Sequence, residues 1–316
     1  MKDYKNFGIV ITCYKGDFFF TKGLLASIKY FCGDIPICII VDGNIDVSQI
    51  VKTYNIVKII RKQDVKNEYL RNNCFGSRLT NLIAFWESPF EYFMYVDSDT
   101  VLWGNVLENF TYNMFDFVHN EPHEAYSPFI MKHQYFDYDK IFEFTEYFKW
   151  EGCHFFNAGI FVMKKGIFNI DETKVLIELF RKDKKLLPRD IQGVINILAY
   201  RTFAKGTITL SEAHLQTIMP LFSKEELSKK FIIKDKRPVV EKNTILHWAG
   251  VKPLLRQNVV FNEPALFFRK QNLIYSKSLW RFMPKFYFWI EEIFAIYQVY
   301  YKSKPKKILK KVFGLK

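Results

Sequence analysis

Short strand-like runs alternate with helix-like runs along the first hundred residues, and this alternation limits the folds open to the chain. The strand-like runs are "FGIVITCY" (Phe7–Tyr14), "IPICIIVDG" (Ile35–Gly43), "IVKII" (Ile56–Ile60) and "EYFMYVDSD" (Glu91–Asp99). Helix-like runs such as "FFFTKGLLASIKYF" and "SRLTNLIAFWES" separate them. Such alternation at short spacing is typical of a parallel sheet with helices on both faces. The sequence therefore predicts an α/β fold with a mixed, mainly parallel sheet.

Polar side chains stand at the carboxyl ends of three of these strands, which is where parallel sheets bind their ligands. Thr12 and Tyr14 end the first strand, Asp42 ends the second, and Asp97 and Asp99 end the fourth. The last pair needs an explanation, because burying a carboxylate is costly unless something offsets its charge. Either backbone amides cap the two aspartates or a cation lies beside them.

A third metal-binding side chain ends a later strand-like run. His247 closes "NTILH", and Gly250 and Lys252 follow it closely. Two carboxylates and one imidazole suit Mn²⁺ or Mg²⁺ that holds a diphosphate. A glycine lets the backbone approach a phosphate, and a lysine places an ammonium on it. We therefore expect Asp97, Asp99 and His247 to bind a divalent metal ion.

Four segments carry a resemblance to a known family. "YVDSDT", "FFNAGIF", "QGVIN" and "HWAGVKP" occur in this order and resemble the landmarks of the family 8 glycosyltransferases, which include glycogenin and bacterial lipopolysaccharide galactosyl- and glucosyltransferases. The resemblance covers roughly residues 7 to 260. It implies the Rossmann-like GT-A fold, a nucleotide-sugar donor linked to UDP, Mn²⁺ (or Mg²⁺) as cofactor, and retention of the anomeric configuration.

The resemblance also implies roles for individual residues. The metal ligands would be Asp97, Asp99 and His247. The residues that would contact the nucleotide-sugar are Thr12, Tyr14, Asp42, Arg78, Ser98, Asn157, Ala158, Gly250 and Lys252. The residues that would act in catalysis are Gln192, Asp190 and Lys252.

Three positions depart from the family's pattern. The gap between the glycine and the lysine of "HWAGVKP" is one residue short, and Leu254 stands where a tryptophan often follows. The family's Asp-Gln-Asp reads Ile191-Gln192-Gly193 here, with Asp190 one position early. Either Asp190 takes over the missing role or the carboxylate is absent. The donor sugar and the stereochemical outcome therefore stay open.

The motifs together predict a metal-dependent transferase that moves a sugar from a nucleotide-sugar to a glycan or lipid-linked acceptor, in bacterial-type surface polysaccharide or lipopolysaccharide synthesis. An inverting transferase on the same fold is the first alternative, and it would need a base such as Asp190 or a carboxylate of the Glu121–Glu151 insertion. A nucleotidylyltransferase would need a Gly-rich loop after the first strand, where "TCYKGDFFF" has one glycine. A membrane-bound glycan-binding protein without catalysis would not need all three metal-binding side chains.

Positive charge is concentrated at the C-terminus. The chain of 316 residues has a formal net charge of +13, and the stretch from Lys302 onward has seven lysines and no acid. Such basicity suits nucleic acid, an anionic membrane or an acidic substrate. The sequence contains no recognised nucleic-acid-binding motif, so we expect an anionic membrane surface as partner and no nucleic acid.

The segment from Ser278 onward is aromatic and then basic. Glu291 and Glu292 interrupt its apolar run and argue against a bilayer span. The segment either packs on the domain or lies at a membrane interface, and we expect the interface. We predict a transferase domain over residues 1–262 and a helical, membrane-associating tail over 263–316. The apolar residues at helical spacing are Phe286, Trp289, Ile290, Ile293, Phe294, Ile296, Tyr297 and Tyr300.

The cysteines and the first residues of the sequence help to predict the cellular compartment of the protein. The five cysteines form no pair with metal-site spacing, which predicts buried free thiols in a reducing compartment. The opening "MKDYKNFG" lacks the apolar segment of a signal peptide. We therefore expect a cytoplasmic protein that is peripheral on the cytoplasmic face of the membrane.

Overall fold

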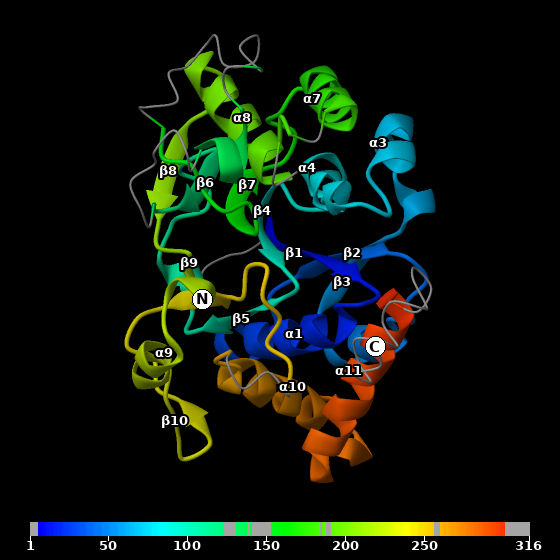
Figure 1. Ribbon diagram of the computed structural model, residues 1–316, viewed down its shortest axis with the longest axis vertical. Helices are drawn as coiled ribbons and strands as arrows, with labels where there is room; N and C mark the ends of the chain where they lie inside the picture. Colours follow the sequence, from blue (N-terminus) through cyan, green and yellow to red (C-terminus); the bar gives the residue numbers. More distant parts are fainter. Residues whose placement is uncertain are drawn as a thin grey trace, which may run out of the picture.

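The computed structural model describes residues 6–122, 131–137, 140, 153–183, 185–187, 191–255 and 260–300, without the side chains of 131 and 296–300. Figure 1 shows its strands in the middle of the molecule, with helices on two sides.

The central sheet has seven strands in the order β3-β2-β1-β4-β7-β6-β8. β7 runs antiparallel to both of its neighbours, and the other pairs are parallel. The expected mixed, mainly parallel α/β sheet is therefore confirmed. Its strands are β1 (Phe7–Tyr14), β2 (Ile37–Asp42), β3 (Ile56–Ile60), β4 (Tyr92–Asp97), β6 (Phe117–Asn120), β7 (Ile160–Lys164) and β8 (Leu210–Ala213).

Helices cover both faces of this sheet because alternate residues of its strands point to opposite sides. Ile9 and Ile11 of β1 belong to one apolar cluster, and Val10 between them belongs to another. In Figure 1, α1 (Phe18–Cys32) and α10 (Glu263–Tyr275) lie on one side of the sheet. The helices on the other side are α4 (Ala84–Glu87), α7 (Ile170–Lys182) and α8 (Ile191–Ala204).

A second, three-stranded sheet brings a distant part of the chain to the end of β4. Its order is β5-β12-β9, with β5 at Thr100–Trp103, β12 at Thr244–His247 and β9 at Gln216–Ile218. β5 directly follows the aspartates that end β4, and β12 pairs with it so that His247 lies opposite Thr100. The sheet therefore carries His247 to Asp97 and Asp99 across a long separation in sequence.

Shorter elements complete the described chain. The helices are α2 (Ser48–Thr53), α3 (Glu68–Asn73), α9 (Lys224–Lys230) and α11 (Pro284–Tyr300), with a π-helical turn η4 (Met131–Tyr135). The short strands are β10 (Ile233–Lys234) and β11 (Arg237–Pro238). The 3₁₀ turns are η1 (Lys62–Asp64), η2 (Arg78–Ile83), η3 (Val106–Glu108), η6 (Met219–Leu221) and η7 (Leu279–Phe282).

The predicted helix over "SRLTNLIAFWES" is only partly α-helical, because it begins with η2. Thr80 explains this start: its hydroxyl oxygen lies 2.6 Å from Asp42 Oδ2 and 2.9 Å from the carbonyl oxygens of Cys74 and Ser77, and its one hydrogen can be donated to any of them. Side-chain bonds of this kind compete with the regular helical pattern. The turn brings Arg78 to the edge of the site described below.

The C-terminal helices pack on the central domain. α10 lies along α1, and its Phe268 is fully buried in the apolar cluster on that face of the sheet. Where the chain divides into two domains stays a prediction. None of the helices in the described part of the chain is long and apolar enough to cross a bilayer.

The cysteine prediction is confirmed as far as the thiols themselves are concerned. All five are free; Cys32 is half-buried and the others are buried. Burial raises the pKa of Cys13, Cys32, Cys38 and Cys74 to about 12. Thiols of this kind are unreactive at neutral pH.

Candidate active site

A cavity of about 690 Å³ opens at the carboxyl ends of β1 and β4. The sequence-predicted residues on its wall come from several separate segments. They are Tyr14, Arg78, Asp97, Ser98, Asp99, Asn157, Ala158, Gln192, His247, Gly250 and Lys252. Thr12 and Asp42 are not on the wall, and Asp190 lies outside the described residues.

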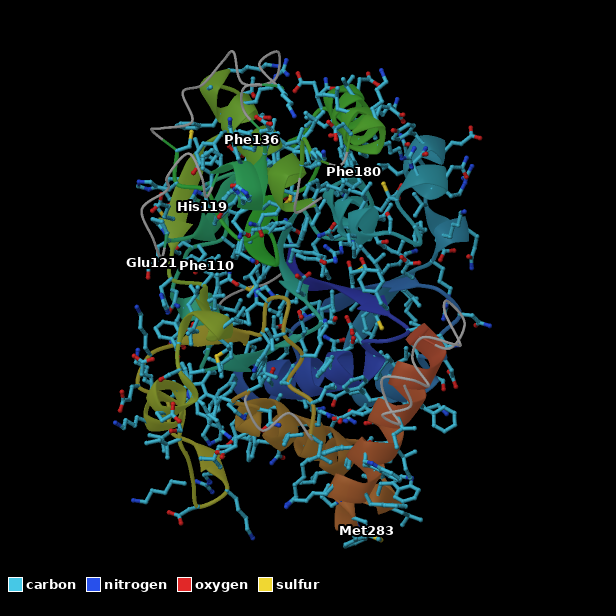
Figure 2. The ribbon with its side chains drawn as sticks, in the orientation of Figure 1. Phe110, His119, Glu121, Phe136, Phe180 and Met283 are labelled. Atoms are coloured by element: carbon cyan, nitrogen blue, oxygen red, sulfur yellow. The ribbon has the colours of Figure 1, made fainter. Side chains whose placement is uncertain are left out.

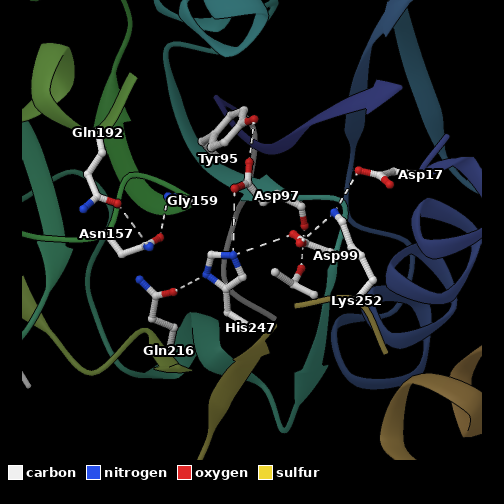
Figure 3. Close-up of polar contacts among 11 residues, drawn as sticks. Asp17, Tyr95, Asp97, Asp99, Asn157, Gly159, Gln192, Gln216, His247 and Lys252 are labelled. Atoms are coloured by element: carbon white, nitrogen blue, oxygen red, sulfur yellow. Dashed lines mark hydrogen bonds and ion pairs between the residues drawn. The ribbon is translucent and has the colours of Figure 1, made fainter. Parts of the chain in front are cut away.

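Asp97, Asp99 and His247 come together on the wall of this cavity (Figure 3). His247 Nε2 is 3.9 Å from Asp97 Oδ2 and 3.7 Å from Asp99 Oδ1. Ligands about 2.1 Å from one ion stand about 3 Å apart when adjacent and about 4.2 Å apart when opposite. Both distances from His247 lie between these limits, and one ligand atom from each of the three side chains lies within 4.8 Å of the others, so the three can surround one divalent ion.

Gln216 orients the imidazole of His247 toward the carboxylates. Its Oε1 lies 2.7 Å from His247 Nδ1, and because Oε1 can only accept, Nδ1 carries the proton. Burial lowers the pKa of His247, which favours the neutral ring. Nε2 then presents its lone pair to the cavity, as a metal-binding imidazole must.

The two aspartates differ in how their charges are offset. Burial opposes ionisation of Asp99, but the pKa of Asp99 is lowered because the Lys252 ammonium lies beside it. Burial and the neighbouring charge of Asp99 raise the pKa of Asp97, although the Tyr95 hydroxyl donates a 3.0 Å hydrogen bond to it. An ionised Asp97 therefore needs further positive charge, which a divalent cation would supply.

Lys252 sits between two carboxylates on the other side of Asp99. Its Nζ donates hydrogen bonds of 2.9 Å to Asp17 Oδ2 and 3.0 Å to Asp99 Oδ2. Burial alone would lower the pKa of Lys252, but Asp99 and Asp17 raise it above its usual range. Three carboxylates thus face one ammonium here, and this excess of negative charge also suits a divalent cation.

Amide side chains form the wall opposite Lys252. Asn157 Oδ1 accepts from the Gly159 amide at 2.9 Å, and Asn157 Nδ2 donates to Gln192 Oε1 at 3.3 Å. Asn196, fully buried on α8, makes two hydrogen bonds with the backbone of Phe156, of 3.0 and 2.9 Å. The segment before β7 is therefore fixed against α8, with its amides facing the cavity.

Gly193 has no room for a side chain. A Cβ built there would lie 2.3 Å from the Tyr135 carbonyl oxygen and 2.6 Å from Leu187 Cδ2. The close packing of η4 on the start of α8 thus explains the glycine in "IQGVIN", where the resembling family has an aspartate. A carboxylate at this position is excluded in this conformation.

Thr12 and Asp42, both expected at the nucleoside, are placed differently. The Thr12 side chain is buried inside the sheet, where β1 pairs with β4 beside Asp97. Asp42 accepts hydrogen bonds from the Gly76 amide, at 2.8 Å, and from Thr80. Neither residue lines the cavity; Asp42 instead holds the turn that leads to Arg78.

Sequence reasoning missed several residues that build the site. Tyr95 could have been found, since it lies two positions before Asp97 on one strand and so shares its face. Asp17, Gln216 and Asn196 gave no local signal, because their roles depend on segments far away in sequence.

The structure is similar to solved glycosyltransferases, although no protein-family model and no curated protein sequence matches the chain. Galactosyltransferase LgtC, solved with donor and acceptor sugar analogs, superposes with a TM-score of 0.53 at 13% identity, over 84% of this chain and 95% of LgtC. Glycosyltransferase GlyE of Streptococcus pneumoniae gives 0.50 at 14% identity, over 90% of this chain and 64% of GlyE. The expected GT-A fold is therefore confirmed.

Substitution of Gly159 by alanine tests how tightly the metal-binding cluster is packed. A Cβ there would lie 2.5 Å from His247 Cε1 and 2.6 Å from Asp97 Oδ2, so the cluster must move apart. We expect Gly159→Ala to weaken Mn²⁺ binding at least tenfold, measured by calorimetry. Overpacking should lower the free energy of unfolding by about 1–3 kcal/mol, which leaves a folded protein. Unchanged Mn²⁺ affinity in a folded variant would contradict the arrangement.

Proposed function

We propose that the protein is a metal-dependent glycosyltransferase that transfers a sugar from a nucleotide-sugar, linked to UDP, to a glycan or lipid-linked acceptor. One observation carries the proposal: Asp97, Asp99 and His247 meet beside Lys252 in one cavity of a GT-A fold. A metal ion and an ammonium can both stabilise the negative charge of a diphosphate leaving group. These side chains can provide both.

Each part of the cavity has a task in this proposal. Asp97, Asp99 and His247 would hold Mn²⁺ or Mg²⁺, which neutralises charge on the diphosphate when bound. The Lys252 ammonium stabilises the negative charge that grows on the leaving diphosphate. Arg78 lines the same cavity and adds a second cation. Asn157 and Gln192, across the cavity, face the donor sugar.

Retention of the anomeric configuration is the favoured stereochemistry. Among the described residues, the carboxylates on the cavity wall are Asp17, Asp97, Asp99 and Glu121. The first three belong to the charged cluster, and we assign the place beside the reacting carbon to Gln192, which lines the same cavity. One solved structure of LgtC is that of an active-site variant in which a glutamine is replaced by glutamate. An amide at this place agrees with a front-face attack assisted by the leaving phosphate.

Glu121 supports inversion instead. It follows β6, reaches the cavity wall and lies 2.6 Å from His214 Nδ1 through its Oε1 (labelled in Figure 2). A base there could activate an acceptor hydroxyl. Identifying the product anomer by NMR decides between the two: retention supports the Gln192 role, and inversion supports Glu121.

A nucleotidylyltransferase and a non-catalytic glycan-binding protein have less support. The connection between β1 and α1 has one glycine in three residues, Lys15, Gly16 and Asp17, which is unlike the Gly-rich loop of a nucleotidylyltransferase. A glycan-binding protein without catalysis would release no free UDP. An Mn²⁺-dependent assay of nucleotide-sugar hydrolysis separates it from a transferase.

Removal of each metal-binding side chain should abolish transfer. We expect Asp97→Ala, Asp99→Ala and His247→Ala each to lower turnover roughly 100-fold or more, since changes one shell further out already cost about 10–100-fold. EDTA should have the same effect on the wild type. Asp34→Asn, at an exposed carboxylate, is the control. Full Mn²⁺-dependent activity of His247→Ala would remove this residue from the site.

Lys252 should matter more in the transition state than in the ground state, because charge develops on the diphosphate. We expect Lys252→Ala to lower kcat about 100-fold with a smaller change in donor affinity. Steady-state kinetics with Lys252→Arg, which keeps the charge, should show partial recovery. A change confined to KM would mean that Lys252 contributes uniform binding.

We further propose that the protein docks on an anionic membrane, on the cytoplasmic face, where a lipid-linked acceptor is concentrated. The polarity of α11 supports this. Glu292 is 5% exposed and faces the domain, whereas Phe286 and Phe294 are 47% and 61% exposed. A surface helix normally has the opposite arrangement. The predicted run from Lys302 onward lies outside the described residues.

The turn before α11 extends this apolar surface. Leu279, Phe282 and Met283 are exposed at the end of the molecule away from Phe136, as the labels in Figure 2 show for Met283. Lys277 and Arg281 lie among them, and residues 264–290 contain no acid. Aromatic side chains with interleaved cations suit an anionic interface, where each cation contributes about 1 kcal/mol.

Vesicle binding tests this surface. The full chain should sediment with anionic vesicles and be released by high salt, and the double variant Leu279→Ser, Phe282→Ser should bind several-fold less. Phe203→Ser is the control, because Phe203 is also apolar and exposed but lies on α8. Equal binding to neutral and anionic vesicles, or none to either, would contradict membrane docking.

A further inference from the structure

α11 is attached to the domain by a buried group of charges. Arg269 of α10 donates to Glu292 Oε1 at 2.5 Å and to Glu291 Oε2 at 3.3 Å. Lys22 of α1 donates to Glu291 Oε1 at 2.8 Å. Arg269 also lies between two aromatic rings: its Cζ is 4.6 Å from the centroid of the Phe19 ring and 4.2 Å from the centroid of the Phe288 ring. Two cations and two anions thus fix α11 against α1 and α10.

Glu292 has a second partner that Glu291 lacks. Its Oε1 and Oε2 accept from the backbone amide of Leu255 at 3.0 and 3.1 Å. Leu255 lies three residues after Lys252, on the segment that leaves the cavity. A buried carboxylate from α11 therefore holds the backbone beside the lysine of the site.

The segment that carries Lys252 is anchored at both ends. At its start, the Trp248 amide donates to the Asp99 carbonyl at 3.3 Å, and the Trp248 indole donates to the Phe261 carbonyl at 2.8 Å. At its end, Asn262 donates to the Leu254 carbonyl at 2.6 Å, next to the Leu255 bond to Glu292. Between these anchors, Lys252 reaches Asp17 and Asp99.

We propose that Glu292 is a positioning residue: through the Leu255 amide it sets the path of the 249–255 segment and so the place of the Lys252 ammonium. The role of Lys252 on a diphosphate rests on the proposed function, whereas the hydrogen bond between Glu292 and Leu255 is independent of it. A hydrogen bond to a charged acceptor is stronger than one between neutral groups, and a shift of about 1 Å in a catalytic group can cost 10²-fold in rate.

Glu291 offers a matched control on the same turn of the same helix. It has the same charge, is also largely buried, and shares Arg269 as a partner. Its hydrogen bonds go to Lys22 and Arg269. Loss of either acid weakens the attachment of α11, but loss of Glu292 also frees Leu255.

Hydrogen exchange in the free protein tests the contact without any ligand. In Glu292→Ala, amide exchange over residues 249–255 should be at least tenfold faster than in the wild type, and Glu291→Ala should leave it near the wild-type rate. Glu292→Gln keeps an acceptor oxygen and should restore most of the protection; it also serves if Glu292→Ala fails to fold. Equal exchange in Glu291→Ala and Glu292→Ala would overturn the proposal.

Turnover with Mn²⁺ and a UDP-sugar tests the consequence. Glu292→Ala should lower kcat about tenfold with little change in KM, and Glu291→Ala should not. In a Lys252→Ala background, the Glu292→Ala change should have no further effect, because both act at one ammonium. A full additional loss there would overturn the positioning role. If the wild type has no turnover and Mn²⁺-pyrophosphate does not stabilise it, the proposed function fails, and the exchange result still decides the contact.

Discussion

The negative charge at the end of β4 is the constraint on which the site depends. Asp97 and Asp99 extend a buried strand into a cavity, and two carboxylates so close together must be offset by positive charge. The ammonium of Lys252, on the segment that follows β12, supplies one positive charge. The neutral imidazole of His247, on β12, supplies a ligand for the divalent cation that would supply the rest. The three-stranded sheet holds His247 in place, and the packing of the C-terminal helices holds the segment that carries Lys252.

The sequence predicted the parts of the fold and site that local patterns encode. The strand runs, the aspartates that end β4 and the histidine that ends β12 all have neighbours that identify them. Gln216 and Asp17 have none, because each acts on a partner in another element, Gln216 on His247 and Asp17 on Lys252. The helix predicted over "SRLTNLIAFWES" begins as the 3₁₀ turn η2, because Thr80 bonds to Asp42 at the end of β2, which is far away in sequence.

The charged residues of α11 show the same limit of prediction from local sequence. Glu291 and Glu292 looked like interruptions of an apolar helix, since their cationic partners lie at Lys22 and Arg269 and cannot be recognised from the helix itself. In the structure Glu292 lies on the buried face of α11 together with Phe288, whereas Phe286, Ile293 and Phe294 are exposed. Periodicity alone identifies two faces of a helix, but it does not say which of them meets the protein.

The crowding at Gly193 has a consequence for how such a chain can change over evolutionary time. A single mutation of Gly193 to aspartate would push the new side chain into the Tyr135 carbonyl of η4. The protein can therefore accept an aspartate at this position only after the 131–135 turn has moved. The two segments are therefore bound to change in a fixed order.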